Sequence, residues 1–239
     1  MDVVLSARDL RKDYAGEPVI RDVNLDLARR EVVAILGVSG SGKTTLFNVL
    51  AGMDPPDGGR VTAAGRIGYM MQKDLLLPWK RMEDNAALPL RLRGTGRREA
   101  RMRVRELLPQ FGLAGAGRKY PHQLSGGMRQ RAALLRTWLF AGDILLLDEP
   151  FASVDALTRL DLQEWLSAEI RDLDLSVLLI THDIEEALRL ADRALVLSGS
   201  PATLTAEFPI PDPRPRTLEQ LASPGMGRVR SSLRAALRP

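Results

Sequence analysis

A glycine-rich run is the segment whose residue types point most directly to phosphate chemistry. Gly37 to Thr44 reads GVSGSGKT, with a lysine and a hydroxyl side chain after its last glycine. Glycines let backbone N–H groups turn toward phosphate oxygens, and the positive end of a following helix favours the same anion. We therefore expect a loop that cradles the phosphates of a nucleotide, built from Gly37, Ser39, Gly40, Ser41, Gly42, Lys43, Thr44 and Thr45.

Within this loop, individual side chains have separate expected tasks. Lys43 is placed to reach the β- and γ-phosphates, and the Thr44 hydroxyl to ligate Mg²⁺. Thr45 is expected to add a contact to the α-phosphate. The flanking sequence supplies the strand and helix that such a loop requires: Glu31 to Leu36 reads as a buried strand, and Thr44 to Leu50 has apolar residues at helical spacing.

Two adjacent acids form a second group of residues that could take part in catalysis or bind a metal ion. Asp148 and Glu149 directly follow the aliphatic run Ile144 to Leu147. Such a run predicts a buried strand, and ligands of open α/β sheets bind at the carboxyl ends of the strands. Successive residues point in different directions, so we expect Asp148 to hold Mg²⁺ and Glu149 to orient or deprotonate an attacking water. ATPases, GTPases and small-molecule kinases would all fit these features.

The elements that must position these groups alternate between strands and helices. Short β-branched runs at Val3 to Leu5 and Val19 to Leu27 predict a β-rich N-terminal portion. The aliphatic runs at residues 144–147 and Val177 to Ile180 are separated by a predicted helix, Leu157 to Ile170, which is typical of parallel strands joined by crossovers. The sequence therefore predicts an α/β core.

The middle and the end of the chain have different compositions. Arginines interleave with apolar residues at helical spacing from Arg91 to Leu108, and Leu134 to Leu139 adds another helical segment. After Leu197 the proline density rises, so we expect a C-terminal tail from about residue 198. Residues 210–239 also carry six arginines against two acids. A basic tail could contact nucleic acid or anionic lipid, but a solvated surface segment is the simpler interpretation.

The overall composition excludes several classes of protein. The chain has 239 residues, of which 45% are hydrophobic and 27% charged, and its net charge is +4. These values are typical of a folded globular protein. The absence of cysteine excludes disulfides and thiolate chemistry. Every apolar run is far shorter than the roughly 20 residues of a membrane span, and the N-terminus lacks the features of a secretory signal, so we expect neither a span nor export.

The run LSGGMRQR, from Leu124 to Arg131, closely resembles the signature of ATP-binding-cassette (ABC) ATPases. Physically, the Ser125 hydroxyl and the Gly126 and Gly127 amides at a helix start would form a second anion site, although SGG alone would also suit a simple helix cap. The resemblance extends over the whole chain. It implies an α/β P-loop NTPase of the ABC ATPase type, with an N-terminal antiparallel β portion, a RecA-like parallel-sheet core and a helical subdomain.

This resemblance also implies domain limits and further site residues. Residues 1–197 would form the ATPase domain, with the helical subdomain at about 78–140, and 198–239 the tail. Tyr14 resembles the aromatic residue that stacks on adenine, although a packing tyrosine would look the same. Gln72 resembles the glutamine that senses γ-phosphate and Mg²⁺, and His182, at the end of a predicted strand, resembles the switch histidine that contacts γ-phosphate.

Members of this family act as head-to-tail dimers, in which the signature of one subunit serves the nucleotide of the other. Ser153-Val154-Asp155 resembles the loop that crosses to the second copy, with Val154 where many relatives have Leu, and Asp155 would contact the partner's site. His122, just before the signature, is expected to be structural. ATP would stabilise the closed dimer, and hydrolysis would remove that bridge.

A finer resemblance concerns the direction of transport. The segment Gln72 to Lys80, QKDLLLPWK, resembles the corresponding loop of importer ATPases of the nitrate, sulfonate and taurine group, as does PRPRT at 213–217. It implies transmembrane permease subunits, an extracytoplasmic solute-binding protein and a peripheral position on the cytoplasmic face of the membrane. Leu76, Leu77 and Trp79 would either dock a permease helix or pack in the core.

Two other classes of ATP-binding protein share parts of this pattern. ABC-type ATPases that act on DNA interrupt the cassette with long coiled coils, and no sustained heptad repeat occurs here. A P-loop kinase would not be expected to carry the signature, Gln72 and His182 together. We therefore expect an ATP hydrolase that is coupled to import and binds no nucleic acid.

Overall fold

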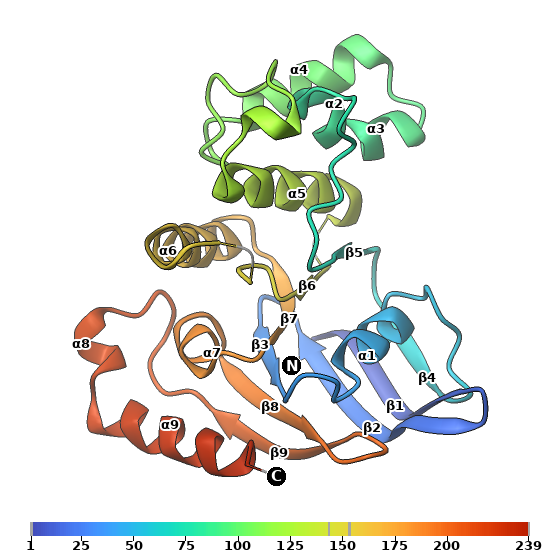
Figure 1. Cartoon of the computed structure of the whole chain (residues 1–239), viewed down its shortest axis with the longest axis vertical. Coiled ribbons are helices and arrows are strands. Elements are labelled where there is room, and N and C mark those ends of the chain that lie inside the picture. Colours follow the sequence, from blue (N-terminus) through green and yellow to red (C-terminus); the bar gives the residue numbers. More distant parts are fainter. Residues whose placement is uncertain (1, 143, 153, 239) are drawn as a thin grey trace.

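A computed structural model describes residues 2–142, 144–152 and 154–238 of the chain. Its N-terminal portion is a three-stranded antiparallel sheet of order β2-β1-β4 (Figure 1). The strands are β1 (Val3–Tyr14), β2 (Glu17–Ala28) and β4 (Gly58–Ala63). Buried and exposed residues alternate along β1 and β2, as expected for strands with one face on the core. The predicted antiparallel portion is thus confirmed.

The central sheet has six strands in the order β5-β6-β7-β3-β8-β9. These are β5 (Ile67–Met70), β6 (Ile144–Asp148), β7 (Ser176–Thr181), β3 (Val32–Leu36), β8 (Arg193–Ser198) and β9 (Thr203–Pro209). Strands β5, β6, β7, β3 and β8 are parallel to one another, and β9 is antiparallel to β8. Every residue of β3, β6 and β7 is buried, which explains their unbroken aliphatic sequences.

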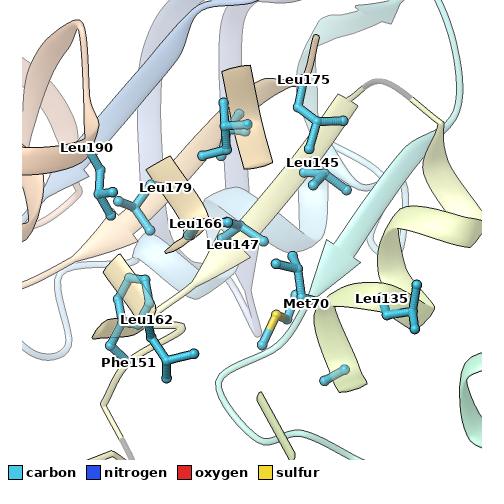
Figure 2. Packing of buried hydrophobic residues seen from close by; sticks show 14 of the residues in the cluster. Met70, Leu135, Leu145, Leu147, Phe151, Leu162, Leu166, Leu175, Leu179 and Leu190 are labelled. Carbon is cyan, nitrogen blue, oxygen red and sulfur yellow. The ribbon is translucent and has the colours of Figure 1, made fainter. Parts of the chain in front are cut away.

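Side-chain alternation along β3 connects two hydrophobic cores. Val33 and Ile35 pack toward the three-stranded sheet and α1 (Lys43–Leu50), together with Phe47. Val32, Ala34 and Leu36 belong to the core on the opposite face of the central sheet. Figure 2 shows part of this second core, which includes Leu145 and Leu147 of β6 together with Met70, Leu162 and Leu166. The sheet is therefore covered on both faces.

Helices α6 (Ala156–Asp172) and α7 (Ile184–Leu190) cover this second face, and a helical subdomain extends from it (Figure 1). The subdomain contains α2 (Met82–Ala86), α3 (Leu88–Leu92), α4 (Arg97–Leu107), the 3-10 turn η1 (Pro121–Gln123) and α5 (Gly126–Ala141). The helical stretch expected from Arg91 to Leu108 is broken, because Gly94 adopts a positive φ of 88° between α3 and α4.

The C-terminal segment is more closely joined to the core than a simple tail. Strand β9 lies beyond the expected boundary at residue 198, yet it is hydrogen-bonded to β8. Helices α8 (Leu218–Leu221) and α9 (Pro224–Ala236) follow, and α9 packs against α7 (Figure 1). Among the described residues, no helix has both the length and the apolarity that crossing a membrane requires.

Candidate active site

The glycine-rich loop connects β3 to α1, as the sequence predicts. Gly40 and Gly42 both have φ of 81°, a conformation that residues with a Cβ rarely adopt. Gly37 meets a different constraint: a Cβ there would lie 2.6 Å from the carbonyl oxygen of Leu197 and 2.6 Å from the Ser41 hydroxyl. The tight turn between strand and helix thus depends on glycine at specific positions.

Lys43 is folded into this loop. Its ammonium group donates hydrogen bonds to the carbonyl oxygens of Gly37 (2.8 Å) and Val38 (2.7 Å). Burial lowers the pKa of Lys43, and the nearby carboxylates of Glu149 and Asp148 partly oppose this. The buried Ser41 hydroxyl has no hydrogen-bond partner among the described residues. A phosphate oxygen would accept a stronger hydrogen bond from the Lys43 ammonium than a carbonyl does, and it would give the Ser41 hydroxyl a partner. Both points support an anion in the loop.

A cavity of about 340 Å³ adjoins the loop. Its lining residues are Val19, Ser39, Gly40, Gly42, Lys43, Thr44, Thr45, Gln72, Asp148 and Glu149. The structure therefore brings the phosphate loop, the two acids and Gln72 to one place, although they are far apart in the sequence.

Asp148 lies at the buried end of β6 and shares one oxygen between two hydroxyls. The Thr44 hydroxyl donates to Oδ2 at 3.2 Å, and the Tyr69 hydroxyl donates to the same atom at 3.3 Å. Burial raises the pKa of Asp148, and burial beside this carboxyl also raises the pKa of Tyr69. A carboxylate and a hydroxyl that face a phosphate cavity are oxygen donors of the type Mg²⁺ prefers.

Tyr69 was not identified from the sequence as a site residue. Its position on β5, beside β6, is what brings its hydroxyl to Asp148. Neither the order nor the lengths of the apolar runs predict that these two strands are neighbours.

Glu149 has a separate environment. Its φ is 44°, in the left-handed region, and its backbone N–H donates to the Ile180 carbonyl at 3.0 Å. The Gln72 side-chain amide donates to Oε2 at 3.2 Å, and His182 Nδ1 lies 3.3 Å from Oε1. These three residues follow β5, β6 and β7, which are neighbours in the sheet. The left-handed backbone turns Glu149 away from the path of β6, so that the two acids take different positions.

The signature residues do not line this cavity. Ser125 caps α5, its hydroxyl accepting the Met128 N–H at 3.3 Å, and a Cβ at Gly127 would lie 2.7 Å from the Thr158 methyl group. Gly126 instead lines a separate cavity of about 370 Å³, which includes Gln72 as well. Gln72 is thus common to both cavities.

Two remaining predicted residues have local structural partners. The Tyr14 side chain is 43% exposed, and its hydroxyl donates to Asp54 at 2.7 Å. Lys12 Nζ lies 5.3 Å from its ring centroid. Asp155 caps α6 by accepting the Thr158 N–H at 3.1 Å. Adenine stacking by Tyr14 and a cross-subunit role of Asp155 stay predictions, and Ser153 lies outside the described residues.

The chain is similar to known proteins over nearly all of its length. A family model described as ABC transporter matches residues 20–152. The formylaminopyrimidine import ATP-binding protein ThiZ of Halalkalibacterium halodurans is 42% identical over 94% of this chain and 90% of its own length. The aliphatic sulfonates import ATP-binding protein SsuB 1 of Pseudomonas fluorescens is also 42% identical, over 96% of this chain and 85% of its own.

Solved structures agree with this similarity. The dimeric ATP-binding cassette MJ0796, in a post-hydrolysis state bound to ADP and Pi, superposes with a TM-score of 0.77 at 27% identity. The alignment covers 87% of this chain and 99% of that one. The cbiO1 structure from Clostridium perfringens has the same fold, with a TM-score of 0.77 at 24% identity.

Proposed function

Because the chain belongs to the ABC transporter family, whose ATP-binding subunits hydrolyse ATP in transport, we propose that it powers the import of a small solute of the nitrate, sulfonate or taurine type. Relatives named for the import of aliphatic sulfonates and formylaminopyrimidine support this direction. The observation that carries the catalytic part is the position of Glu149 between Gln72 and His182, beside the loop that holds Lys43.

The residues around the cavity divide the work of hydrolysis. Lys43 and the loop amides would hold the phosphates of ATP, and Thr44 with Asp148 would hold Mg²⁺ beside them, with Gln72 as a further ligand. Bound there, Mg²⁺ would neutralise charge on the phosphate oxygens. Glu149 would accept the proton of the attacking water while the bond between the γ-phosphorus and the bridging oxygen breaks, yielding ADP and phosphate. Gln72 and His182 fix the orientation of the Glu149 carboxylate.

The second copy of the chain completes the site in this proposal. Ser125, Gly126 and Gly127 do not line the phosphate cavity of their own chain, so they are free to contact the nucleotide of a partner. The dimeric cassette structures support a dimer of this chain, and we propose that its two copies are arranged head to tail. Closure around ATP and release after hydrolysis would then drive the membrane partner.

An apolar groove offers the permease a docking place. It has a volume of about 480 Å³ and is lined by Ala51, Met53, Ile67, Tyr69, Leu88, Pro89, Leu92, Arg136, Thr137 and Phe140. Leu92 is 84% exposed, although it is large and apolar. Arg136 donates from the groove to the carbonyls of Asp74 and Leu75, which follow Gln72. A permease helix bound in the groove would therefore contact a residue, Arg136, that is hydrogen-bonded to the segment following Gln72.

This groove differs from the apolar dock considered from the sequence. Leu76 is buried and Trp79 is 71% exposed, and neither lines the groove. We propose that a helix of a permease subunit occupies the groove, which places the protein peripherally on the cytoplasmic face of the membrane. An extracytoplasmic solute-binding protein would deliver the solute to that permease.

The decisive experiment is to purify the chain with the membrane protein that accompanies it and to reconstitute the complex in vesicles. We expect one solute class to stimulate ATP hydrolysis, and Glu149→Gln to abolish it. Leu92→Glu should weaken permease binding while the isolated chain keeps its ATP affinity. Leu218→Glu, which changes a leucine on α8 that is 74% exposed, is the matched control. Stimulation by DNA without any membrane partner would contradict the proposal.

A further inference from the structure

The helix that follows His182 is too short to be stable by itself. Helix α7 has seven residues, and its N-cap is Asp183, whose carboxylate accepts the Glu185 N–H at 2.8 Å. Isolated helices shorter than about 12 residues are marginal in water. The position of His182, immediately before the cap, therefore depends on the contacts that hold α7 in place.

The C-terminal end of α7 is held by a buried arginine from the proline-rich segment. Arg216 is 7% exposed, and its guanidinium donates to the carbonyl of Leu188 at 2.9 Å. It also donates to the carbonyls of Pro211 (3.1 Å) and Asp212 (2.8 Å). Burial lowers the pKa of Arg216 to about 10. A cation is favourable beside the carbonyls that end a helix, and these acceptors offset the loss of hydration.

The same segment is fastened to the central sheet. The Arg214 guanidinium donates to both carboxylate oxygens of Asp192 at 2.9 Å. Asp192 in turn accepts the backbone N–H of Val32 at 2.8 Å, where β3 begins. The PRPRT segment, which the site chemistry does not use, is therefore a strap between the sheet and the end of α7.

The N-terminal end of α7 is held by α9. Arg230 donates to both carboxylate oxygens of Glu185, at 2.5 and 2.9 Å, and to the Leu221 carbonyl at 3.2 Å. This contact holds the pKa of Glu185 below its usual value. Met226 and Leu233 of α9 are fully buried, which fixes the helix that carries Arg230. Glu185 lies only three positions after His182, so the ion pair between Arg230 and Glu185 lies close to the active site.

We propose that residues 211–237 form a clamp on α7 and that Arg230 is a positioning residue for ATP hydrolysis. The clamp holds the His182–Asp183 turn so that the imidazole faces Glu149. This inference rests on the proposed hydrolysis at Glu149, but it assigns a role to a segment that contacts neither the phosphate cavity nor the apolar groove.

The first test measures steady-state hydrolysis by the full chain carrying Arg230→Ala. We expect kcat to fall on the order of tenfold with KM for ATP changed less than about twofold, because the nucleotide contacts stay intact while His182 loses its orientation. Arg230→Lys, which keeps one charged donor, should recover part of the loss. The matched control is Arg228→Ala, an exposed arginine of α9 without an ion pair among the described residues, and it should match the wild type.

The second test separates positioning from general stability. In a His182→Ala background, Arg230→Ala should lower the residual kcat less than about twofold, because no imidazole remains to be positioned. An equal tenfold loss in both backgrounds would overturn the proposal, as would a kcat like that of Arg228→Ala. If the wild type hydrolyses ATP and Glu149→Gln does not, the proposed function stands whatever Arg230 does. A wild-type chain that hydrolyses no ATP even in the complex with its membrane partner would refute that function itself.

Discussion

The imidazole Nδ1 of His182 lies 3.3 Å from carboxylate oxygen Oε1 of Glu149. The two residues directly follow neighbouring parallel strands, and the Gln72 amide donates to the other carboxylate oxygen at 3.2 Å. Each oxygen of Glu149 therefore has a nitrogen of a neighbouring side chain close to it. A carboxylate fixed in this way can accept a proton from a water placed at the phosphate cavity, and the loss of its charge should affect catalysis more than binding.

Glu149→Gln should abolish turnover while ATP binding is retained. An amide keeps the shape of the side chain but cannot accept the proton, so we expect at least about a 100-fold lower kcat. Phosphate release measures the rate, and equilibrium binding of ATP measures the retained affinity. The variant should also accumulate as a closed dimer with ATP, detectable by size-exclusion chromatography. Near-normal phosphate release would remove Glu149 as the catalytic base.

Lys43→Ala should act on nucleotide binding itself. The ammonium group is buried and bonded only to loop carbonyls among the described residues, so it is available to a phosphate. We expect the affinity for ATP to fall by at least about tenfold, since a charge-assisted bond contributes on the order of 1.5–3 kcal/mol. Isothermal titration with ATP checks this. Lys119→Ala, an exposed lysine that lines neither this cavity nor the one that contains Gly126, is the control, and an equal loss there would contradict the assignment.

Gly37→Ala should damage the loop through a backbone clash. The added Cβ would lie 2.6 Å from the Leu197 carbonyl oxygen, and backbone cannot rotate away as a side chain can. We expect a stability loss of about 1–3 kcal/mol together with weaker ATP binding. Gly96→Ala is the control, because its φ is −57° and nothing lies within 4 Å of the added methyl group. Thermal melting with and without ATP distinguishes the two variants.

The local motifs and the long-range contacts of this site differ in how far the sequence predicts them. The phosphate loop, Asp148 and Glu149 are each defined by neighbouring residues, and all of them line one cavity. Buried parallel strands can also be predicted from the sequence, because burial on both faces of a sheet requires continuous aliphatic runs. These features depend on local sequence alone.

Other features depend on which elements are neighbours in space. Tyr69 reaches Asp148 because β5 pairs with β6, and Arg216 reaches α7 across 28 positions of the chain. The expected tail also contains the edge strand β9, which itself ends at a proline, Pro209. No spacing rule gives such contacts. The sequence therefore indicates which residues could do chemistry but not which elements hold them in place.

Asp84→Asn should lower stability in a pH-dependent way. The Arg101 guanidinium donates to both oxygens of Asp84, at 2.7 and 2.5 Å, and lowers the pKa of this buried carboxyl. Because the folded pKa lies below the ordinary 3.8, the stabilisation is complete above 3.8 and is lost as the pH falls through the folded value. We expect Asp84→Asn to cost about 1–3 kcal/mol at pH 7. The difference from wild type should shrink below pH 3.8.

Urea unfolding at pH 7 and at acid pH measures that difference. The control is Glu99→Gln, which removes an exposed i,i+4 pair with Arg103 and should cost less than about 0.5 kcal/mol. A loss for Asp84→Asn that stays constant down to pH 2 would show that the ion pair is not its cause.

A mixture of Ser125→Arg and Lys43→Ala chains should recover ATP hydrolysis that neither chain shows alone. If the signature serves the partner's nucleotide, a mixed dimer has one site with both defects and one site with Lys43 and Ser125 intact. With random pairing, half of the dimers are mixed, so we expect about a quarter of wild-type activity if the sites act independently. Lys43→Ala mixed with Asp148→Asn leaves a defect in every site and should stay inactive. Equal inactivity of both mixtures would mean that Ser125 acts on its own chain's nucleotide.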